Sequence, residues 1–330
     1  MSEMQMALTN TAGITSVMSF WVFVASNGFK NRKDLLVKIG SGAMVLAFAS
    51  LTAAIIMRGI DSQRFPLANL YESLLWFAWA TMGSYLLLAK AYGVRQLGWL
   101  AALTALMMFL YGSWLPQSQH EIQPLVPALV SYWRWIHVPP LIISYALFFL
   151  GGLAGFIQLY MAGRIQSLIC AVVTVCLALL AVGLGTFTTV DTAWLQILFA
   201  GASLLGSIIS FKLLQRIDKK IGDPKLAEIY DDVSYRCIAI GMPALTFGII
   251  TGGLWANHAW GTYWSWDPKE SMALVTWLSY AAYIHLRVHR ECSSERLALV
   301  SIVGLLLTLM TYLGFNSLGL GGLHSYGKFK

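Results

Sequence analysis

The chain has 330 residues, of which 58% are hydrophobic and only 11% are charged. Soluble domains carry about 25% charged residues, so this composition excludes a soluble globular protein and a protein with a single membrane anchor. The net charge of +7 does not indicate a nucleic-acid partner, because membrane proteins concentrate their cations in the loops on one side. The sequence therefore predicts an all-α, polytopic integral membrane protein.

Ten apolar segments are long enough to cross a membrane, since a spanning helix needs about 20 mostly apolar residues. They are predicted near residues 11–29, 39–57, 69–89, 96–115, 138–161, 167–187, 192–211, 237–256, 268–287 and 297–315. No repeat or second domain interrupts them, so residues 1–330 are interpreted as one membrane domain. The first segment has no basic region before it, which disfavours a cleavable signal peptide. The four cysteines form no C-x-x-C pair and are interpreted as core residues.

The basic residues predict how these segments are oriented. Sixteen of the 22 lysines and arginines fall in one set of alternating loops, and the other six fall in the second set. Loops that are rich in Lys and Arg stay on the inner side of a membrane. We therefore expect both termini, and the tryptophan-rich loop at 257–270, to lie on the outer side.

The stretch at 255–270 reads WANHAWGTYWSWDPKE and is the most unusual part of the chain. Its five aromatic residues are Trp255, Trp260, Tyr263, Trp264 and Trp266. Trp and Tyr are ordinary anchors at membrane interfaces. The density of rings here exceeds what anchoring needs, and it favours a flat apolar surface for a large planar ligand.

Asp267, within the same stretch, has two interpretations. The order Asp267-Pro268-Lys269-Glu270 is typical of a helix N-cap, followed by proline at the first helical position and glutamate at the third. Asp267 is therefore predicted to cap the helix at 268–287. It could also contact a ligand. The two roles are compatible, because a cap would fix the position of the adjacent Trp266.

Two histidines are predicted to lie on the outer side. His137 stands in SYWRWIHVPP, where Pro139 and Pro140 suit the first turn of the helix that follows. His324 stands in GLGGLHSYG, where the glycines let the backbone approach a ligand closely. Position alone leaves simpler alternatives open, since His137 could be a surface or capping residue and His324 part of a polar tail.

A third histidine, His285, lies 17 residues after Pro268. At about 1.5 Å per residue, this separation is about 26 Å along the helix. His285 is thus expected near the inner edge of the membrane, where an ionisable residue is a functional candidate. His289 is one turn further and could form half of a helical metal site, but the sequence offers no third ligand. His258, inside the tryptophan-rich stretch, competes with the two outer histidines as a ligand.

Several separated stretches resemble the CcsA (ResC) family, the haem-handling subunit of the System II cytochrome c synthase. They are FPLANLYESLLWFAW at 65–79, PLVPALVSYWRWIHVPPLIISYA at 124–146, DDVSYRCIAIGMPALTFGIITGGLWANHAWGTYWSWDPKE at 231–270, ALVTWLSYAAYIHLR at 273–287 and YLGFNSLGLGGLHSYG at 312–327. The tryptophan-rich "WWD" run alone is shared with the related CcmC and CcmF proteins. The joint match, in this order, is specific to CcsA.

The resemblance implies roles for individual residues. His137 and His324 would be the two axial ligands of the iron in a haem that lies on the WWD surface. His285 would ligate haem within the membrane, opposite a histidine of the partner subunit CcsB (ResB). The implied haem-binding set is His137, His324, His285, Trp255, Trp260, Tyr263, Trp264, Trp266 and Asp267.

Two features depart from the family pattern. His258 stands where an acidic residue is expected in a WANEAWG-like string. The family typically has eight spans, whereas this sequence predicts ten, with two extra segments at about 163–213. Two additional spans preserve the sidedness of the chain, so the implied mechanism can survive them.

The resemblance also implies a function. The chain would transport haem b across the membrane and present it to apocytochrome c, whose C-x-x-C-H motif forms thioethers with the haem vinyl groups. The implied partners are CcsB, the apocytochrome and a thioredoxin-like thiol reductant. No nucleophile–base pair is needed in this chain, because the cofactor and the apocytochrome carry the reactive groups. The implied location is a bacterial inner membrane or a thylakoid membrane.

Four outer cations, Arg58, Arg64, Arg134 and Lys269, could meet the two haem propionates. Simple anchoring at the membrane interface is the favoured interpretation for each of them.

Two other functions stay open. A secondary transporter of another hydrophobic molecule would need a polar site at the membrane midplane. Glu72 is the best candidate residue for such a site, although it is predicted near the outer end of its span. A non-catalytic assembly scaffold would hold CcsB without binding haem.

Overall fold

The computed structural model describes residues 2–125, 129–162, 224–289, 292–314 and 324. All regular secondary structure in these residues is helical, so the predicted all-α class is confirmed. Contacts divide the chain into two compact units, residues 1–153 with 233–330 and residues 154–232. The site described below belongs to the first unit. The predicted segments at 167–187 and 192–211 lie outside the described residues.

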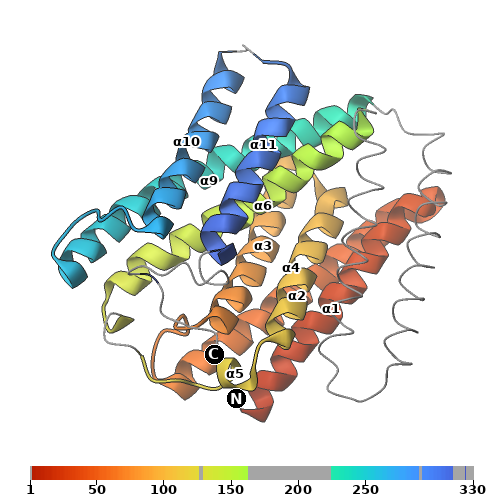
Figure 1. The fold of residues 1–330 in the computed structure, drawn as a ribbon. Coiled ribbons are helices and arrows are strands. Elements are labelled where there is room, and N and C mark those ends of the chain that lie inside the picture. Colours follow the sequence, from red (N-terminus) through yellow and green to blue (C-terminus); the bar gives the residue numbers. More distant parts are fainter. Residues whose placement is uncertain (1, 126–128, 163–223, 290–291, 315–323, 325–330) are drawn as a thin grey trace, which may run out of the picture. The chain divides into compact units, whose positions relative to one another are not determined.

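Nine α-helices occur in the described residues (Figure 1). They are α1 (Glu3–Gly28), α2 (Lys33–Ser62), α3 (Leu70–Tyr92), α4 (Gly98–Trp114), α5 (Gln117–His120), α6 (Trp133–Met161), α9 (Pro224–Trp260), α10 (Pro268–Val288) and α11 (Ser294–Leu309). Short 3₁₀ turns at Lys30–Arg32 and Arg95–Leu97 join α1 to α2 and α3 to α4. A π-helical turn at Met310–Gly314 ends α11.

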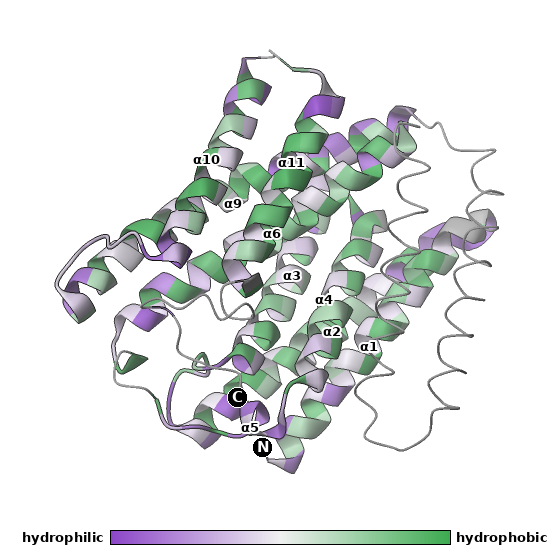
Figure 2. Cartoon of the chain, viewed as in Figure 1, coloured by the Kyte–Doolittle hydropathy of each residue, from purple (hydrophilic) through white to green (hydrophobic). Residues whose placement is uncertain are grey.

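Six of the described helices, α1, α2, α3, α6, α9 and α11, are long and apolar enough to cross a membrane. Helix α4 is apolar but shorter, and α10 has 21 residues with a polar first turn. Hydrophobic residues dominate the middles of the helices, and hydrophilic residues are more frequent near their ends (Figure 2). The chain is therefore a polytopic helical membrane protein, and eight of the predicted segments coincide with helices.

Four helices, α1, α2, α6 and α9, begin at least five residues earlier than predicted. Helix α6 starts at Trp133, so Pro139 and Pro140 lie inside it and not in its first turn. Two intrahelical hydrogen bonds are lost there because proline has no N–H, but its fixed φ is compatible with a helix. Helix α9 starts at Pro224, well before the expected residue 237. Hydropathy finds only the apolar part of a helix, and the polar turns that extend it outside the membrane give no such signal.

Helices α6 and α9 run in opposite directions and pack closely through glycines (Figure 1). A Cβ atom at Gly241 would come within 2.7 Å of Phe148, and one at Gly248 within 2.3 Å of Leu141. Small residues allow membrane helices to approach this closely, because dispersion contacts replace the hydrophobic drive that is absent in lipid. This close packing fixes where the side chains of α6 lie relative to α9.

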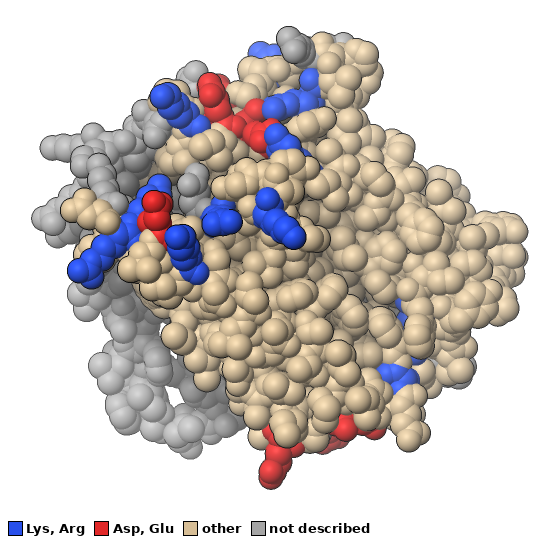
Figure 3. Space-filling model, turned by 180° about the vertical axis from the view of Figure 1, so that it is seen from behind, with Lys and Arg blue, Asp and Glu red and all other residues tan. Residues whose placement is uncertain are grey.

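Charged side chains are distributed unevenly over the first unit. On the face drawn in Figure 3, Lys and Arg gather at the end where α1 joins α2 and α3 joins α4, together with a few acidic residues. Lys33, Lys90 and Arg95 lie at these connections. The wide middle of this face carries few charges. This is the pattern of a chain whose middle is surrounded by lipid.

Candidate functional site

The tryptophan-rich loop ends in the predicted helix cap. The Asp267 carboxylate accepts a hydrogen bond from the backbone N–H of Lys269 at 3.0 Å, and the Asp267 N–H donates to Glu270 Oε2 at 3.3 Å. Glu270 Oε2 also accepts from the N–H of Ser265 at 2.8 Å. The capping box at the start of α10 is therefore confirmed. It fixes the chain immediately before the helix, where Trp266 adopts a left-handed φ of 57° that side chains rarely adopt.

The same aspartate holds His324. The distance from Asp267 Oδ1 to His324 Nδ1 is 3.0 Å, and Asp267 is only 6% exposed. An ionised carboxylate can only accept hydrogen bonds, so Nδ1 carries the proton and Nε2 carries the lone pair. Burial lowers the pKa of His324, and the nearby cation of Lys269 lowers that pKa further. His324 is thus held as a neutral imidazole, the form that binds a metal ion.

His137 is held in the same tautomer by a different partner. Its Nδ1 lies 2.7 Å from the carbonyl oxygen of Gly248 on α9, which can only accept a hydrogen bond. Its Nε2 therefore also carries a lone pair. A Cβ atom at Gly252 would come within 2.5 Å of the His137 ring, and the ring packs edge-on against Trp255. The position of His137 depends on the close contact between α6 and α9.

Both histidines line one cavity of about 290 Å³. They come from segments 187 residues apart in the sequence. The wall is mostly apolar, as is usual for a site that binds a large organic ligand. The lining residues are Leu67, Ala68, Asn69, Leu70, Ser73, Gln119, Leu129, His137, Val138, Leu141, Ile142, Tyr145, Ile249, Gly252, Gly253, Trp255, Tyr263, Trp264, Lys269, Glu270, Ala273, Thr311, Tyr312 and His324.

The predicted aromatic surface is only partly within this cavity. Trp255, Tyr263 and Trp264 line it. Trp260 supports it from outside, because its ring packs edge-on against His324 with centroids 5.2 Å apart. Trp266 is 71% exposed and touches the cavity only indirectly, through its contact with Trp264. The five rings therefore do not form one flat apolar surface.

The other histidines named from the sequence lie away from the cavity. His258 is exposed and its ring lies near Tyr132, with centroids 6.3 Å apart. His285 lies in the last turn of α10, at the end of the helix opposite the cap. Its ring packs against His289, with centroids 4.4 Å apart. No group of three or more metal-binding side chains occurs among the described residues, so this pair lacks a third ligand there.

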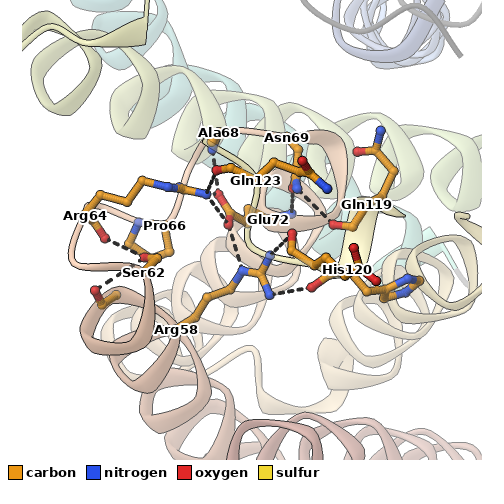
Figure 4. Close-up of polar contacts among 12 residues, drawn as sticks. Arg58, Ser62, Arg64, Pro66, Ala68, Asn69, Glu72, Gln119, His120 and Gln123 are labelled. Carbon is orange, nitrogen blue, oxygen red and sulfur yellow. Dashed lines mark hydrogen bonds and ion pairs between the residues drawn. The ribbon is translucent and has the colours of Figure 1, made fainter. Parts of the chain in front are cut away.

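Two of the predicted outer cations are engaged by Glu72 in a buried cluster (Figure 4). Glu72 accepts from Arg58 Nε at 2.7 Å, from Arg64 Nη1 at 3.0 Å and from the N–H of Ala68 at 2.6 Å. Arg58 also donates to the carbonyl oxygens of His120 and Glu121. Each charge is paired and bonded, which burial requires. The cluster ties the connection between α2 and α3 to the end of α5, and it leaves Glu72 unsuited to binding a transported molecule.

The profile of the family described as "Cytochrome C assembly protein" matches residues 67–324, which include both cavity histidines. The CcsA cytochrome c biogenesis protein of Synechococcus elongatus is 38% identical over 322 residues, covering 96% of this chain and 94% of the relative. That of Cyanophora paradoxa is 38% identical over 331 residues, covering 99% of each. The chain belongs to the CcsA family of cytochrome c assembly proteins. The CcsA relative in Guillardia theta is 34% identical over 315 residues, or 95% of this chain and 92% of the relative. The family resemblance is thus confirmed along nearly the whole chain.

Sequence reasoning overlooked two positions on which the site depends. Gly248 accepts the hydrogen bond of His137, and Gly252 makes room for its ring. The sequence carries a signal for both, since they form a G-x-x-x-G pattern, which is typical of close helix packing in membranes.

Proposed function

We propose that this chain transports haem across a membrane and presents it to apocytochrome c, as the CcsA-type subunit of a cytochrome c synthase. The observation that carries the proposal is the pair of histidines in one apolar cavity. His137 and His324 each donate Nδ1–H to a fixed acceptor, Gly248 in one case and Asp267 in the other, which leaves Nε2 of each without a proton, and both residues line the same cavity. Membership of the CcsA family supports the same function.

The chemistry of haem suits this cavity. Haem b is planar and mostly apolar, and its iron takes neutral imidazole at both axial positions. His137 on α6 and His324 near the C-terminus would supply these two ligands. Trp255, Tyr263 and Trp264 would contact the porphyrin and exclude water, as buried aromatic rings do. The haem is a substrate that the chain receives and hands on.

The attachment reaction requires positioning more than side-chain catalysis. Each cysteine thiol of the apocytochrome C-x-x-C-H motif adds across a haem vinyl group, so an S–H bond and the vinyl π bond are replaced by C–S and C–H bonds. No oxidant is consumed. The histidine of the motif would displace either His137 or His324 from the iron, and the product would then leave. The chain orients the haem and keeps competing reactions away.

Haem would enter the pathway at His285, near the opposite end of α10 from the cavity. A histidine of CcsB would supply the second ligand there, and a thioredoxin-like protein would keep the apocytochrome thiols reduced. With the ten spans expected from hydropathy, the distribution of Lys and Arg supports a chain with both termini and the 257–270 loop on the outer side. The membrane would be a bacterial inner membrane or a thylakoid membrane, in keeping with the relatives in Synechococcus and Cyanophora.

A maturation assay tests this proposal. The chain and CcsB are produced together with a reporter apocytochrome c, and covalently bound haem is measured in the reporter. The variants His137→Gly and His324→Gly should each abolish holocytochrome formation, and added imidazole should restore it by filling the vacated ligand position. The variant His258→Gly is the matched control, since this exposed histidine does not line the cavity. Normal maturation with both cavity histidines replaced would overturn the proposal.

A further inference from the structure

Lys269 is a charged residue in the otherwise mostly apolar wall of the cavity. It is the second residue of α10, and its backbone N–H is fixed by the Asp267 carboxylate at 3.0 Å. Its side chain is half-buried and lines the same space as His137 and His324. The Lys269 cation lies near enough to the second histidine to lower the pKa of His324. A cation therefore stands beside the two proposed iron ligands.

The carboxylates near Lys269 are engaged by other donors. Asp267 Oδ1 accepts from His324 and from a backbone N–H. Glu270 Oε2 accepts from the N–H and hydroxyl of Ser265 and from the N–H of Asp267. Within the described part of the chain, the Lys269 ammonium makes no ion pair. Asp267 attracts the Lys269 ammonium without forming an ion pair with it, and burial still disfavours the charged form. An anionic ligand would offset that cost.

The other outer cations do not compete for this role. Arg58 and Arg64 are bound to Glu72. Arg134 is buried and is absent from the cavity wall. Lys269 is therefore the Lys or Arg that the described structure offers to a ligand in the cavity.

We propose that Lys269 binds a propionate carboxylate of the haem and makes the site selective for porphyrins with free carboxylates. This inference rests on the proposed function and adds the chemical group that the site recognises. In haem b the two propionates share one edge of the ring, and the vinyl groups lie on the other pyrroles. A propionate held at the start of α10 orients the vinyl groups away from Lys269, toward the side from which the thiols must arrive.

A binding experiment with two ligands tests the role of Lys269. The full chain is purified with CcsB, and haem or haem dimethyl ester, which lacks the free carboxylates, is titrated while the Soret band is recorded. The wild type should bind haem about tenfold more tightly than the ester, because a charge-assisted contact contributes at least a tenfold difference in affinity. Lys269→Met should lose this preference through weaker haem binding alone. Lys269→Arg should retain it.

The ester is also the folding control, because Lys269→Met should bind it as well as the wild type does. An equal preference for haem in the wild type and in Lys269→Met would overturn the inference. If the wild type bound both ligands equally through His137 and His324, the proposed function would stand and the role of Lys269 would fall. If the wild type bound neither ligand, the proposed function and this inference would fall together.

Discussion

Asp267 and His324 are joined by a hydrogen bond of 3.0 Å between Oδ1 and Nδ1 across 57 residues of sequence. The same carboxylate oxygen caps α10 through the N–H of Lys269. One aspartate thus fixes a helix end and a histidine at the same time. A carboxylate that accepts from Nδ1 orients the imidazole and makes Nε2 a stronger ligand. This relationship gives the aspartate of the WWD run a physical role beyond capping.

Replacing Asp267 with Asn tests this role. Asparagine is as good an N-cap as aspartate, so α10 should keep its start, but the neutral amide is a weaker acceptor for His324. Haem affinity should fall about tenfold or more, as is common when a carboxylate behind a ligating histidine is changed. A Soret titration of the purified complex measures this loss. Unchanged affinity in Asp267→Asn would show that the hydrogen bond does not support the ligand.

Replacing Gly252 with Ala tests the packing that positions His137. The added Cβ would lie 2.5 Å from the His137 ring, so the ring must move away from its acceptor on α9. Overpacking of this kind destabilises a protein by about 1–3 kcal/mol. We expect less holocytochrome and a weaker two-histidine haem spectrum. Gly13→Ala in α1 is the control, because a Cβ there meets no atom within 4 Å. Equal holocytochrome yields from the two variants would contradict this role of Gly252.

Replacing Glu72 with Gln tests the buried cluster that it forms with Arg58 and Arg64. Arg58 is fully buried, and loss of the carboxylate leaves it and Arg64 without a counter-charge. Breaking a buried ion pair destabilises a protein by about 3–5 kcal/mol. Thermal unfolding in detergent should occur at a clearly lower temperature than in the wild type. Asp34→Asn removes an exposed carboxylate and should leave the midpoint unchanged. Equal midpoints for the two variants would contradict a structural role for Glu72.

Replacing His285 with Gly separates haem entry from haem presentation. His285 lies at the end of α10 opposite the cap, away from the cavity. The variant should contain little haem when it is purified from cells, since the inner ligand is missing. Haem added directly to the purified complex should still bind with wild-type affinity. Loss of this direct binding would place His285 in the outer site or show that it holds the fold together.

Local signals predicted parts of this structure well. The order Asp-Pro-Lys-Glu predicted the cap at Asp267, because all the groups involved are within four residues of each other. Hydropathy found eight of the helices but placed the starts of α6 and α9 too late, since it detects the apolar part alone. A helix start that lies in a polar turn cannot be predicted from hydropathy, because it depends on contacts with neighbouring elements.

Contacts between residues far apart in the sequence could not be predicted from the residue pattern. No pattern in the residues predicts that His137 and His324 line one cavity, and only the family resemblance paired them. The ion cluster of Glu72 joins the α2–α3 connection to the start of α3, whereas the sequence suggested interfacial anchoring or ligand contacts for its cations. The contact of His137 with Gly248 depends on how α6 packs against α9. In the sequence, only the G-x-x-x-G pattern indicates that close packing.

The proposed function requires His137 and His324 to ligate one haem iron in the cavity that both residues line. The most direct test uses the His285→Gly variant, purified with CcsB and loaded with added haem, so that the outer site alone contributes to the optical and electron paramagnetic resonance spectra. We expect a low-spin spectrum of two-histidine ligation. Further replacement of His137 or His324 with Gly should convert it to a one-histidine spectrum, which imidazole reverses. An unchanged two-histidine spectrum after both replacements would contradict the account.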